Sequence, residues 1–184
     1  RVRRQRQMCI RDRSEIIAIW NGGIAIYGAV IGVVIALFAY SRGKKLSFAC
    51  LCDLAAFGLL IGQCIGRWGN FVNGEAHGGE TDLPWGMSID GADPVHPTFL
   101  YESLWNLIGF IALHFYSKKR KFPGEIALLY VAWYGLGRAW IEGLRTDSLY
   151  IGTLRVSQVL AAVGCIVAIA LLVRQYNRIK VQKA

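Results

Sequence analysis

Charged residues, histidines and familiar catalytic motifs are all scarce in this chain of 184 residues. Charged residues make up 18% of it, and it has three histidines and four prolines. It contains no HExxH zinc motif, no CxxC pair, no glycine-rich P-loop and no GxSxG nucleophile turn. These absences exclude the common zinc hydrolases, dithiol oxidoreductases, nucleotide hydrolases and serine hydrolases. We expect the chemistry to need no metal and no other cofactor.

The cysteines are unsuited to disulfides in both number and position. There are five, Cys9, Cys50, Cys52, Cys64 and Cys165, and the last four lie in or beside apolar stretches. A small secreted domain held by disulfides shows an even number of cysteines. A single residue separates Cys50 from Cys52, which is too close for a typical zinc pair. We interpret the cysteines as small apolar packing residues.

Apolar residues are what the chain has in excess. They make up 54% of it, and the mean hydropathy is +0.37, on the apolar side of a typical soluble domain. A membrane-spanning helix needs about 20 mostly apolar residues. Five segments qualify: 16–40, 46–65, 99–117, 126–144 and 156–173. The sequence therefore predicts an all-α fold, a polytopic integral membrane helical bundle with about five transmembrane helices.

The placement of the seven lysines supports this arrangement. They follow the first, third and fifth segments: Lys44, Lys45, Lys118, Lys119, Lys121, Lys180 and Lys183. If the segments alternate across a bilayer, these positions share one side, and the positive-inside rule makes that side cytoplasmic. The connection at residues 66–97 is then an ordered extracytoplasmic loop.

More than half of the net charge of +9 lies in residues 1–13. This run has six arginines and one aspartate, so it carries +5. A signal peptide is excluded because the uncharged stretch that follows is far longer than an h-region of about 7–15 residues. We interpret residues 1–13 as a non-native basic leader and expect no nucleic-acid partner. Residues 14–184 are predicted to form a single membrane-embedded domain.

The densest polar cluster spans residues 66–78, directly after the second apolar segment. It contains Arg67, Asn70, Asn73, Glu75 and His77, with glycines between them. Glycines let backbone amides approach an anion closely, and an arginine can hold a phosphate through two parallel N–H bonds. This pattern favours a phosphate site. The alternative is an arginine snorkelling at a membrane boundary, followed by a turn.

A second cluster lies on one face of the fourth predicted helix. Tyr134, Arg138, Glu142 and Arg145 are spaced by four, four and three residues, so they form a polar stripe. Ionisable groups at membrane depth are costly unless they face a protein interior or a water-filled cavity. We interpret the stripe as an anion-binding wall in which Glu142 positions Arg138 and Arg145. The alternative is a self-neutralised group that holds two helices together.

Two further places carry residues that suit proton transfer. His96 stands at the start of the third segment and is a candidate general base, although Tyr101 and Glu102 beside it equally suit a role in orienting loops. Tyr27 lies between glycines in the first segment, where a packed tyrosine is the commoner case. Asp53 and Gln63, on the second segment, are expected to hydrogen-bond a neighbouring helix.

Three motifs, at residues 66–75, 96–102 and 134–147, resemble the bacterial prolipoprotein diacylglyceryl transferase family. The resemblance runs from residue 20 to about residue 172. It implies a multi-pass enzyme of the cytoplasmic membrane with its active site toward the extracytoplasmic side. It also implies transfer of diacylglyceryl from phosphatidylglycerol to the lipobox cysteine thiol of a prolipoprotein signal peptide. The product is a thioether, and glycerol phosphate leaves.

The resemblance assigns roles to individual residues. It matches Arg67 to the family's phospholipid-binding arginine, Asn70, Asn73 and Glu75 to its polar neighbours, and Arg138, Glu142 and Arg145 to a second essential group. Together with the residue patterns, this gives a predicted catalytic set of Arg67, Arg138, Glu142, His96 and Tyr27, and a predicted substrate-binding set of Arg67, Asn70, Asn73, Glu75, Tyr134 and Arg145. Tyr27 stands where many members have a histidine, so either it orients substrate or His96 takes the proton. Members usually carry two further helices before this region, and we therefore expect the chain to be amino-terminally truncated.

Two other functions compete with this interpretation. A CDP-alcohol phosphatidyltransferase needs clustered metal-binding aspartates along its helices, and only Asp53 lies well inside a predicted span. A non-catalytic anionic-phospholipid-binding or transporter subunit would use the same arginines to hold a head group. A measurement of turnover distinguishes this second alternative from the transferase, because a binding subunit forms no product.

Overall fold

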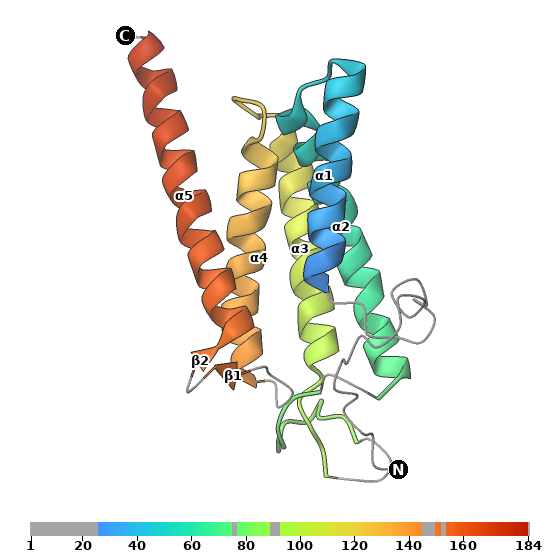
Figure 1. Ribbon diagram of the computed structural model, residues 1–184. Helices are drawn as coiled ribbons and strands as arrows, with labels where there is room; N and C mark the ends of the chain where they lie inside the picture. The colour runs from blue at the N-terminus through green and yellow to red at the C-terminus, as the bar shows by residue number, and fades with distance from the viewer. Residues whose placement is uncertain (1–25, 75–76, 89–92, 145–149, 152–153, 184) are drawn as a thin grey trace. The chain divides into compact units, whose positions relative to one another are not determined.

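The computed structural model describes residues 26–74, 77–88, 93–144, 150–151 and 154–183 (Figure 1). The chain divides into two compact units, Arg1–Leu46 and Ser47–Ala184. The first unit contains helix α1, Ile26–Lys44, with Arg42 and Lys44 in its last turn. The proposed basic leader lies outside the described residues, so its interpretation stays a prediction.

The second unit contains four long helices: α2 (Phe48–Val72), α3 (Thr98–Ser117), α4 (Glu125–Leu144) and α5 (Val156–Lys183). Consecutive helices run antiparallel (Figure 1), and α4 packs against each of the other three. Two short strands, β1 (Tyr150–Ile151) and β2 (Leu154–Arg155), pair antiparallel between α4 and α5. The predicted helical fold is confirmed for the described part of the chain.

The alternation gives the second unit two distinct ends. One end, which we call the lysine end, holds the α3–α4 turn with Lys118, Lys119 and Lys121, and also the last turns of α5 (Figure 1). The opposite end, which we call the arginine end, holds the end of α2, the start of α3 and the last turns of α4. Rings of Phe71 and Phe99, whose centroids are 4.9 Å apart, join α2 to α3 there.

Helix α2 continues past its predicted end at residue 65, so the prediction of a loop over residues 66–72 is wrong. Gly66 and Gly69 lie inside the helix and do not form an anion-binding loop. A glycine inside a helix costs only about 1 kcal/mol relative to alanine, which ring contacts such as Trp68 on Phe99 (5.5 Å) offset. The helix ends at Val72, just before Gly74 adopts a φ of 62°, a conformation that glycine favours.

Two of the described helices are long and apolar enough to cross a membrane, Phe48–Val72 and Ser157–Gln182. Many of their large apolar side chains are exposed, as Leu54 (70% exposed) and Ile166 (67% exposed) illustrate. Such a surface is rare on a soluble monomer. The prediction of a membrane-spanning bundle is thus supported for α2 and α5, and membrane crossing by α1, α3 and α4 stays a prediction.

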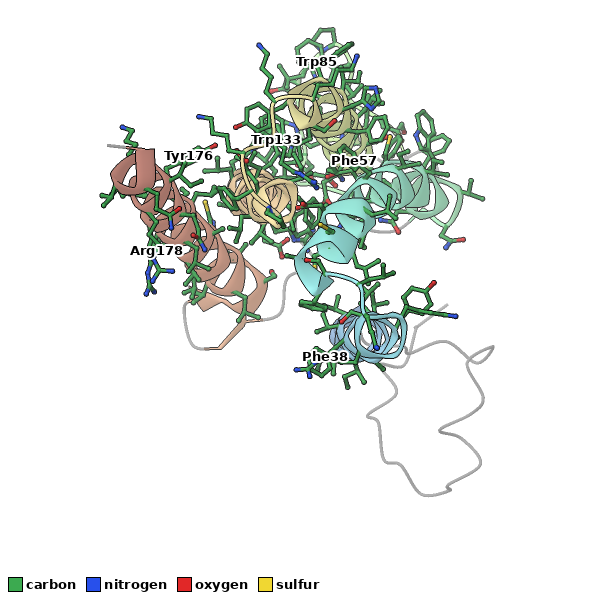
Figure 2. All side chains as sticks on the ribbon, turned by 90° about the horizontal axis from the view of Figure 1, so that it is seen from above. Phe38, Phe57, Trp85, Trp133, Tyr176 and Arg178 are labelled. Atoms are coloured by element: carbon green, nitrogen blue, oxygen red, sulfur yellow. The ribbon has the colours of Figure 1, made fainter. Side chains whose placement is uncertain are left out.

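A pair of stacked indoles fixes α3 against α4. The rings of Trp105 and Trp133 lie 4.4 Å apart, and each indole N–H donates to the other residue's backbone carbonyl at 3.0 Å. Figure 2 shows Trp133 pointing from α4 toward α3. A Cβ at Gly137 would lie 2.2 Å from Trp105 Nε1, so glycine permits this close approach. The stack sets the register in which polar groups of α3 and α4 meet nearer the arginine end.

A buried carboxylate joins α2 to the α3–α4 turn at the lysine end. Asp53 accepts hydrogen bonds from Arg120 Nη1 (3.0 Å), Gly124 N (2.9 Å) and Ala127 N (2.9 Å). It is 3% exposed. The expectation that Asp53 hydrogen-bonds a neighbouring helix is confirmed.

A second buried carboxylate, Glu125, joins α3, α4 and α5 at the same end. It accepts hydrogen bonds from the hydroxyls of Tyr116 and Tyr176 and from the backbone N–H groups of Lys121 and Phe122. Tyr176 therefore lies on the inner side of α5, whereas Arg178 points away from the other helices of this unit (Figure 2).

Candidate functional site

Two arginines from different helices meet at one carboxylate near the arginine end. Glu102, in the second turn of α3, forms ion pairs with Arg67 Nη2 of α2 (2.5 Å) and with Arg138 Nη1 of α4 (3.0 Å). The three residues come from the three motifs of the sequence. The fold thus brings together groups that are up to 71 residues apart in the chain, and we call Arg67, Glu102, Arg138 and Glu142 the arginine cluster.

Glu142 extends the arginine cluster toward α5. Its Oε2 lies 2.7 Å from Arg138 Nη2, one helical turn back along α4, and its Oε1 accepts a hydrogen bond from Ser157 Oγ at 2.7 Å. Gln158 Nε2 donates to the carbonyl of Ala139 at 2.7 Å, so two residues at the start of α5 hold this part of α4. The structure thus places Glu142 against Arg138, and the positioning role of Glu142 stays a prediction.

Exposure differs between the acids and the bases of the arginine cluster. The side chains of Glu102 and Glu142 are 5% and 3% exposed, whereas those of Arg67 and Arg138 are 20% and 15% exposed. The carboxylates therefore lie behind the guanidinium groups. An arginine carries five N–H donors, and the ion pair to Glu102 engages a single nitrogen of Arg67. This arrangement presents cationic donors outward, where an anionic group can bind.

A small cavity adjoins the arginine cluster between α3 and α4. It is lined by Glu102, Trp105, Asn106, Tyr134, Gly137, Arg138 and Ile141. Its accessible volume is about 10 Å³, which is room for about one water molecule. Tyr134, predicted to bind substrate, thus shares a wall with Arg138.

His96 lies in the loop before α3. Its Nδ1 is 3.3 Å from the hydroxyl of Tyr101, which also accepts a hydrogen bond from Trp85 Nε1 at 2.9 Å. Its backbone pairs with Gly78 and Gly79. No contact that we observe among the described residues joins His96 to the arginine cluster, so its role as a base stays a prediction.

Several predicted site residues gain no contact with the arginine cluster or lie where the structure gives no description. Asn70 is in the last turn of α2, and Asn73 caps that helix with its N–H bonded to Gly69 O at 3.0 Å. Tyr27 belongs to the first turn of α1, in the other unit, and its side chain is outside the described part. Glu75 and Arg145 lie outside the described residues.

Sequence reasoning treated Glu102 as no more than an orienting residue and did not single out Asn106 or Ser157. The structure makes Glu102 the group that joins the two arginines. Glu102 and Asn106 are four residues apart on one face of a mostly apolar helix. That spacing is the pattern that could have identified both of them.

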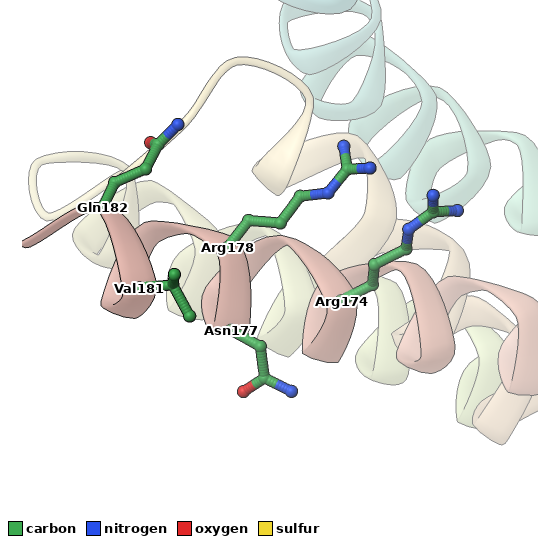
Figure 3. Close-up of a pocket in the computed structure, with 5 residues that line it drawn as sticks. All are labelled: Arg174, Asn177, Arg178, Val181 and Gln182. Atoms are coloured by element: carbon green, nitrogen blue, oxygen red, sulfur yellow. The ribbon is translucent and has the colours of Figure 1, made fainter. Parts of the chain in front are cut away.

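A second hollow, larger than the cavity beside the arginine cluster, lies elsewhere on the described surface, at the lysine end. It has a volume of about 580 Å³ and is lined by Arg174, Asn177, Arg178, Val181 and Gln182, all from the last turns of α5. Figure 3 shows Arg174 and Arg178 extending to one side of the helix and Asn177 to the other. Because a single helix forms its lining, it is an open basic surface. The smaller cavity beside the arginine cluster has the better arrangement for chemistry.

Comparison with known proteins identifies the family to which the chain is similar. The family model described as prolipoprotein diacylglyceryl transferase matches residues 7–174. Relatives named phosphatidylglycerol–prolipoprotein diacylglyceryl transferase include those of Clostridioides difficile, 47% identical over 156 residues, and Listeria innocua, 50% identical over 178 residues. The alignments cover 85% and 90% of this chain but 62% and 63% of the relatives. A relative from Acaryochloris marina is 50% identical over 161 residues, covering 82% of this chain and 59% of its own length.

The chain therefore spans about three fifths of the length of these curated relatives. The family match nevertheless covers most of the chain, including all three motifs that build the arginine cluster. On these grounds the chain belongs to the prolipoprotein diacylglyceryl transferase family.

Proposed function

We propose that this protein transfers the diacylglyceryl group of phosphatidylglycerol to the lipobox cysteine thiol of a prolipoprotein. The observation that carries the proposal is the convergence of Arg67 and Arg138 on Glu102. Two partly exposed guanidinium groups backed by buried carboxylates suit a phosphate ester, because planar guanidinium groups donate paired hydrogen bonds to phosphate oxygens. The names of the relatives supply the two substrates.

The reaction exchanges one bond for another at a glycerol carbon. The sulfur of the acceptor forms a C–S bond to the carbon that carries the phosphate, and the C–O bond to the phosphate breaks. The electron pair leaves with glycerol phosphate, and the thiol proton passes to a base. Negative charge accumulates on the departing phosphate, so Arg67 and Arg138 lower the barrier by stabilising that charge.

For the base and the remaining binding residues, we propose the roles that the sequence motifs suggest. His96 and Tyr27 are the candidates to accept the thiol proton or to orient the acceptor. Tyr134 adjoins Arg138 in the cavity and is proposed to contact the lipid head group. Asn70, Asn73, Glu75 and Arg145 are proposed as further substrate contacts.

We propose that the protein is a multi-pass enzyme of the bacterial cytoplasmic membrane. Lys118, Lys119, Lys121 and Lys180 share the lysine end, which the positive-inside rule assigns to the cytoplasm. The arginine end then faces the extracytoplasmic side, where signal peptides of exported prolipoproteins arrive. The lipid bilayer supplies phosphatidylglycerol at the same boundary.

The experiment measures transfer by the chain joined to the amino-terminal segment of the Clostridioides difficile relative, in vesicles that contain phosphatidylglycerol. The readouts are the thioether product on a lipobox peptide and the release of labelled glycerol phosphate. Removing one charge-stabilising donor costs about 10²–10³-fold in rate, so Arg67→Ala or Arg138→Ala is expected to lower turnover by at least that factor.

Matched controls separate loss of chemistry from loss of folding. Arg178→Ala removes an arginine of α5 that points away from the other helices of its unit, and turnover is expected to stay unchanged. Arg67→Lys keeps the charge but loses the planar fork, so it is expected to recover only part of the activity. Normal turnover by folded Arg67→Ala would refute the site. Lipid binding without peptide-dependent release would favour a non-catalytic phospholipid-binding subunit instead.

A further inference from the structure

Asn106 carries a buried oxygen that lacks a partner. The residue is 2% exposed, and its Oδ1 has no hydrogen-bond partner among the residues that the structure describes. Leaving a buried acceptor unpaired is costly, and most such atoms in proteins are paired with protein or with a bound molecule. An unpaired acceptor beside a cavity therefore points to a ligand that donates a hydrogen bond.

The position of Asn106 relates it to the arginine cluster. It lies one turn beyond Glu102 on the same face of α3, about 6 Å farther along the helix axis. It lines the same small cavity as Arg138 and Tyr134. A molecule whose phosphate is held by the arginines can thus place a second polar group against Asn106.

The chemistry of the cavity limits what that second group is. Asn106 Oδ1 needs a hydrogen-bond donor, whereas Arg138 on the opposite wall offers donors and attracts an acceptor. A hydroxyl satisfies both because it donates one hydrogen bond and accepts others. The volume of about 10 Å³ admits one such group.

We propose that Asn106 is a specificity-determining residue that accepts a hydrogen bond from a hydroxyl of the phospholipid head group. This inference rests on the proposed function, which supplies a lipid whose head group is a glycerol. A head group without a hydroxyl leaves Asn106 Oδ1 unpaired and is disfavoured. The preference for phosphatidylglycerol thus arises in part from a single buried carboxamide.

The test compares phosphatidylglycerol with the analogue whose head group is propanol and therefore has no hydroxyl. Both are short-chain lipids added to the purified fusion protein in detergent, and binding is read from the concentration dependence of the melting temperature. One neutral hydrogen bond predicts that the unsubstituted protein binds phosphatidylglycerol about 3- to 10-fold more tightly. Asn106→Leu is expected to bind the two lipids equally.

The variants distinguish recognition from folding. Asn106→Leu removes an unpaired buried oxygen, so it is expected to melt no lower than the unsubstituted protein in the absence of lipid. Asn106→Ser keeps an acceptor and is expected to retain part of the preference. Gln63→Leu is the matched control: Gln63 Oε1 is also buried without a partner among the described residues, but Gln63 does not line this cavity, so the preference is expected to persist.

The outcomes separate this inference from the proposed transfer reaction. A preference that Asn106→Leu abolishes supports the inference even if no thioether forms, because binding is measured without turnover. Equal binding of both lipids by the unsubstituted protein overturns it. An equal loss of affinity for both lipids in Asn106→Leu also overturns it, because a water molecule held by Asn106 would be present with either lipid.

Discussion

Buried carboxylates join helices at both ends of the second unit, but their partners differ. At the lysine end, Asp53 and Glu125 accept hydrogen bonds mainly from backbone N–H groups and tyrosine hydroxyls. At the arginine end, Glu102 and Glu142 are paired with guanidinium groups. Backbone N–H groups belong to fixed turns, whereas a guanidinium on a long side chain can change partners. The contacts at the lysine end therefore hold the helices together, and we propose that the arginine end receives an anion.

The largest expected effect comes from neutralising the carboxylate between the two arginines. Glu102→Gln removes the negative charge that draws Arg67 and Arg138 together. It also places an amide N–H₂ group, which is a hydrogen-bond donor, against a guanidinium that is itself a donor. A misplacement of about 1 Å can cost 10²-fold in rate, so we expect kcat/KM for lipobox-peptide transfer to fall by about that factor for each folded molecule.

The matched control for Glu102→Gln is Glu80→Gln, at an exposed glutamate of the loop before α3. Transfer by the control is expected to equal that of the unsubstituted protein. Full activity in folded Glu102→Gln would contradict our inference that the arginine end, unlike the lysine end, takes part in the transfer reaction.

At the lysine end the expected effect is on stability. Asp53→Asn replaces an oxygen that faces N–H donors by an amide nitrogen, so buried donors of Arg120, Gly124 or Ala127 lose their acceptor. Each buried donor left unpaired costs about 1–3 kcal/mol. We expect a lower melting temperature in detergent and unchanged transfer for each molecule that remains folded.

Arg120→Gln provides the comparison for Asp53→Asn. The Arg120 side chain is 38% exposed, so its ion pair with Asp53 is expected to contribute little and the melting temperature to fall less. A larger drop for Arg120→Gln than for Asp53→Asn would show that the charge pair, and not the backbone bonds, holds this end.

The smallest effect is a dependence of stability on pH at Glu125, which lies just outside the predicted span. Burial raises the pKa of its carboxyl, but hydrogen bonds from Tyr116, Tyr176 and two backbone N–H groups together outweigh this and hold the pKa below its usual value of 4.5. A depressed pKa in the folded state contributes stability above the unfolded pKa and loses it as the pH falls through the folded pKa.

The melting temperature of the unsubstituted protein is therefore expected to fall below about pH 4.5 more steeply than that of Glu125→Gln, which does not titrate. Measurement in the same detergent at pH values from 3 to 7 tests this difference. Parallel curves for the two proteins would contradict the assignment.

Sequence reasoning succeeded where one helix face or one local pattern was sufficient. The four-residue spacing of Arg138 and Glu142 predicted their contact, which measures 2.7 Å. The polarity of Asp53 within an apolar segment predicted a hydrogen bond to another helix, which the structure confirms. Reasoning failed over residues 66–72, because glycines suggested a loop where aromatic packing on Phe99 keeps α2 helical.

The sequence by itself determined the apolar helices, the sorting of lysines and the three motifs, since these depend on composition and on spacing along one chain. Only the tertiary structure decided that Glu102 joins Arg67 to Arg138 and that Asn106 faces their cavity. Such contacts depend on the register between helices. That register follows from close packing such as the stack of Trp105 on Trp133 against Gly137, which no local pattern specifies.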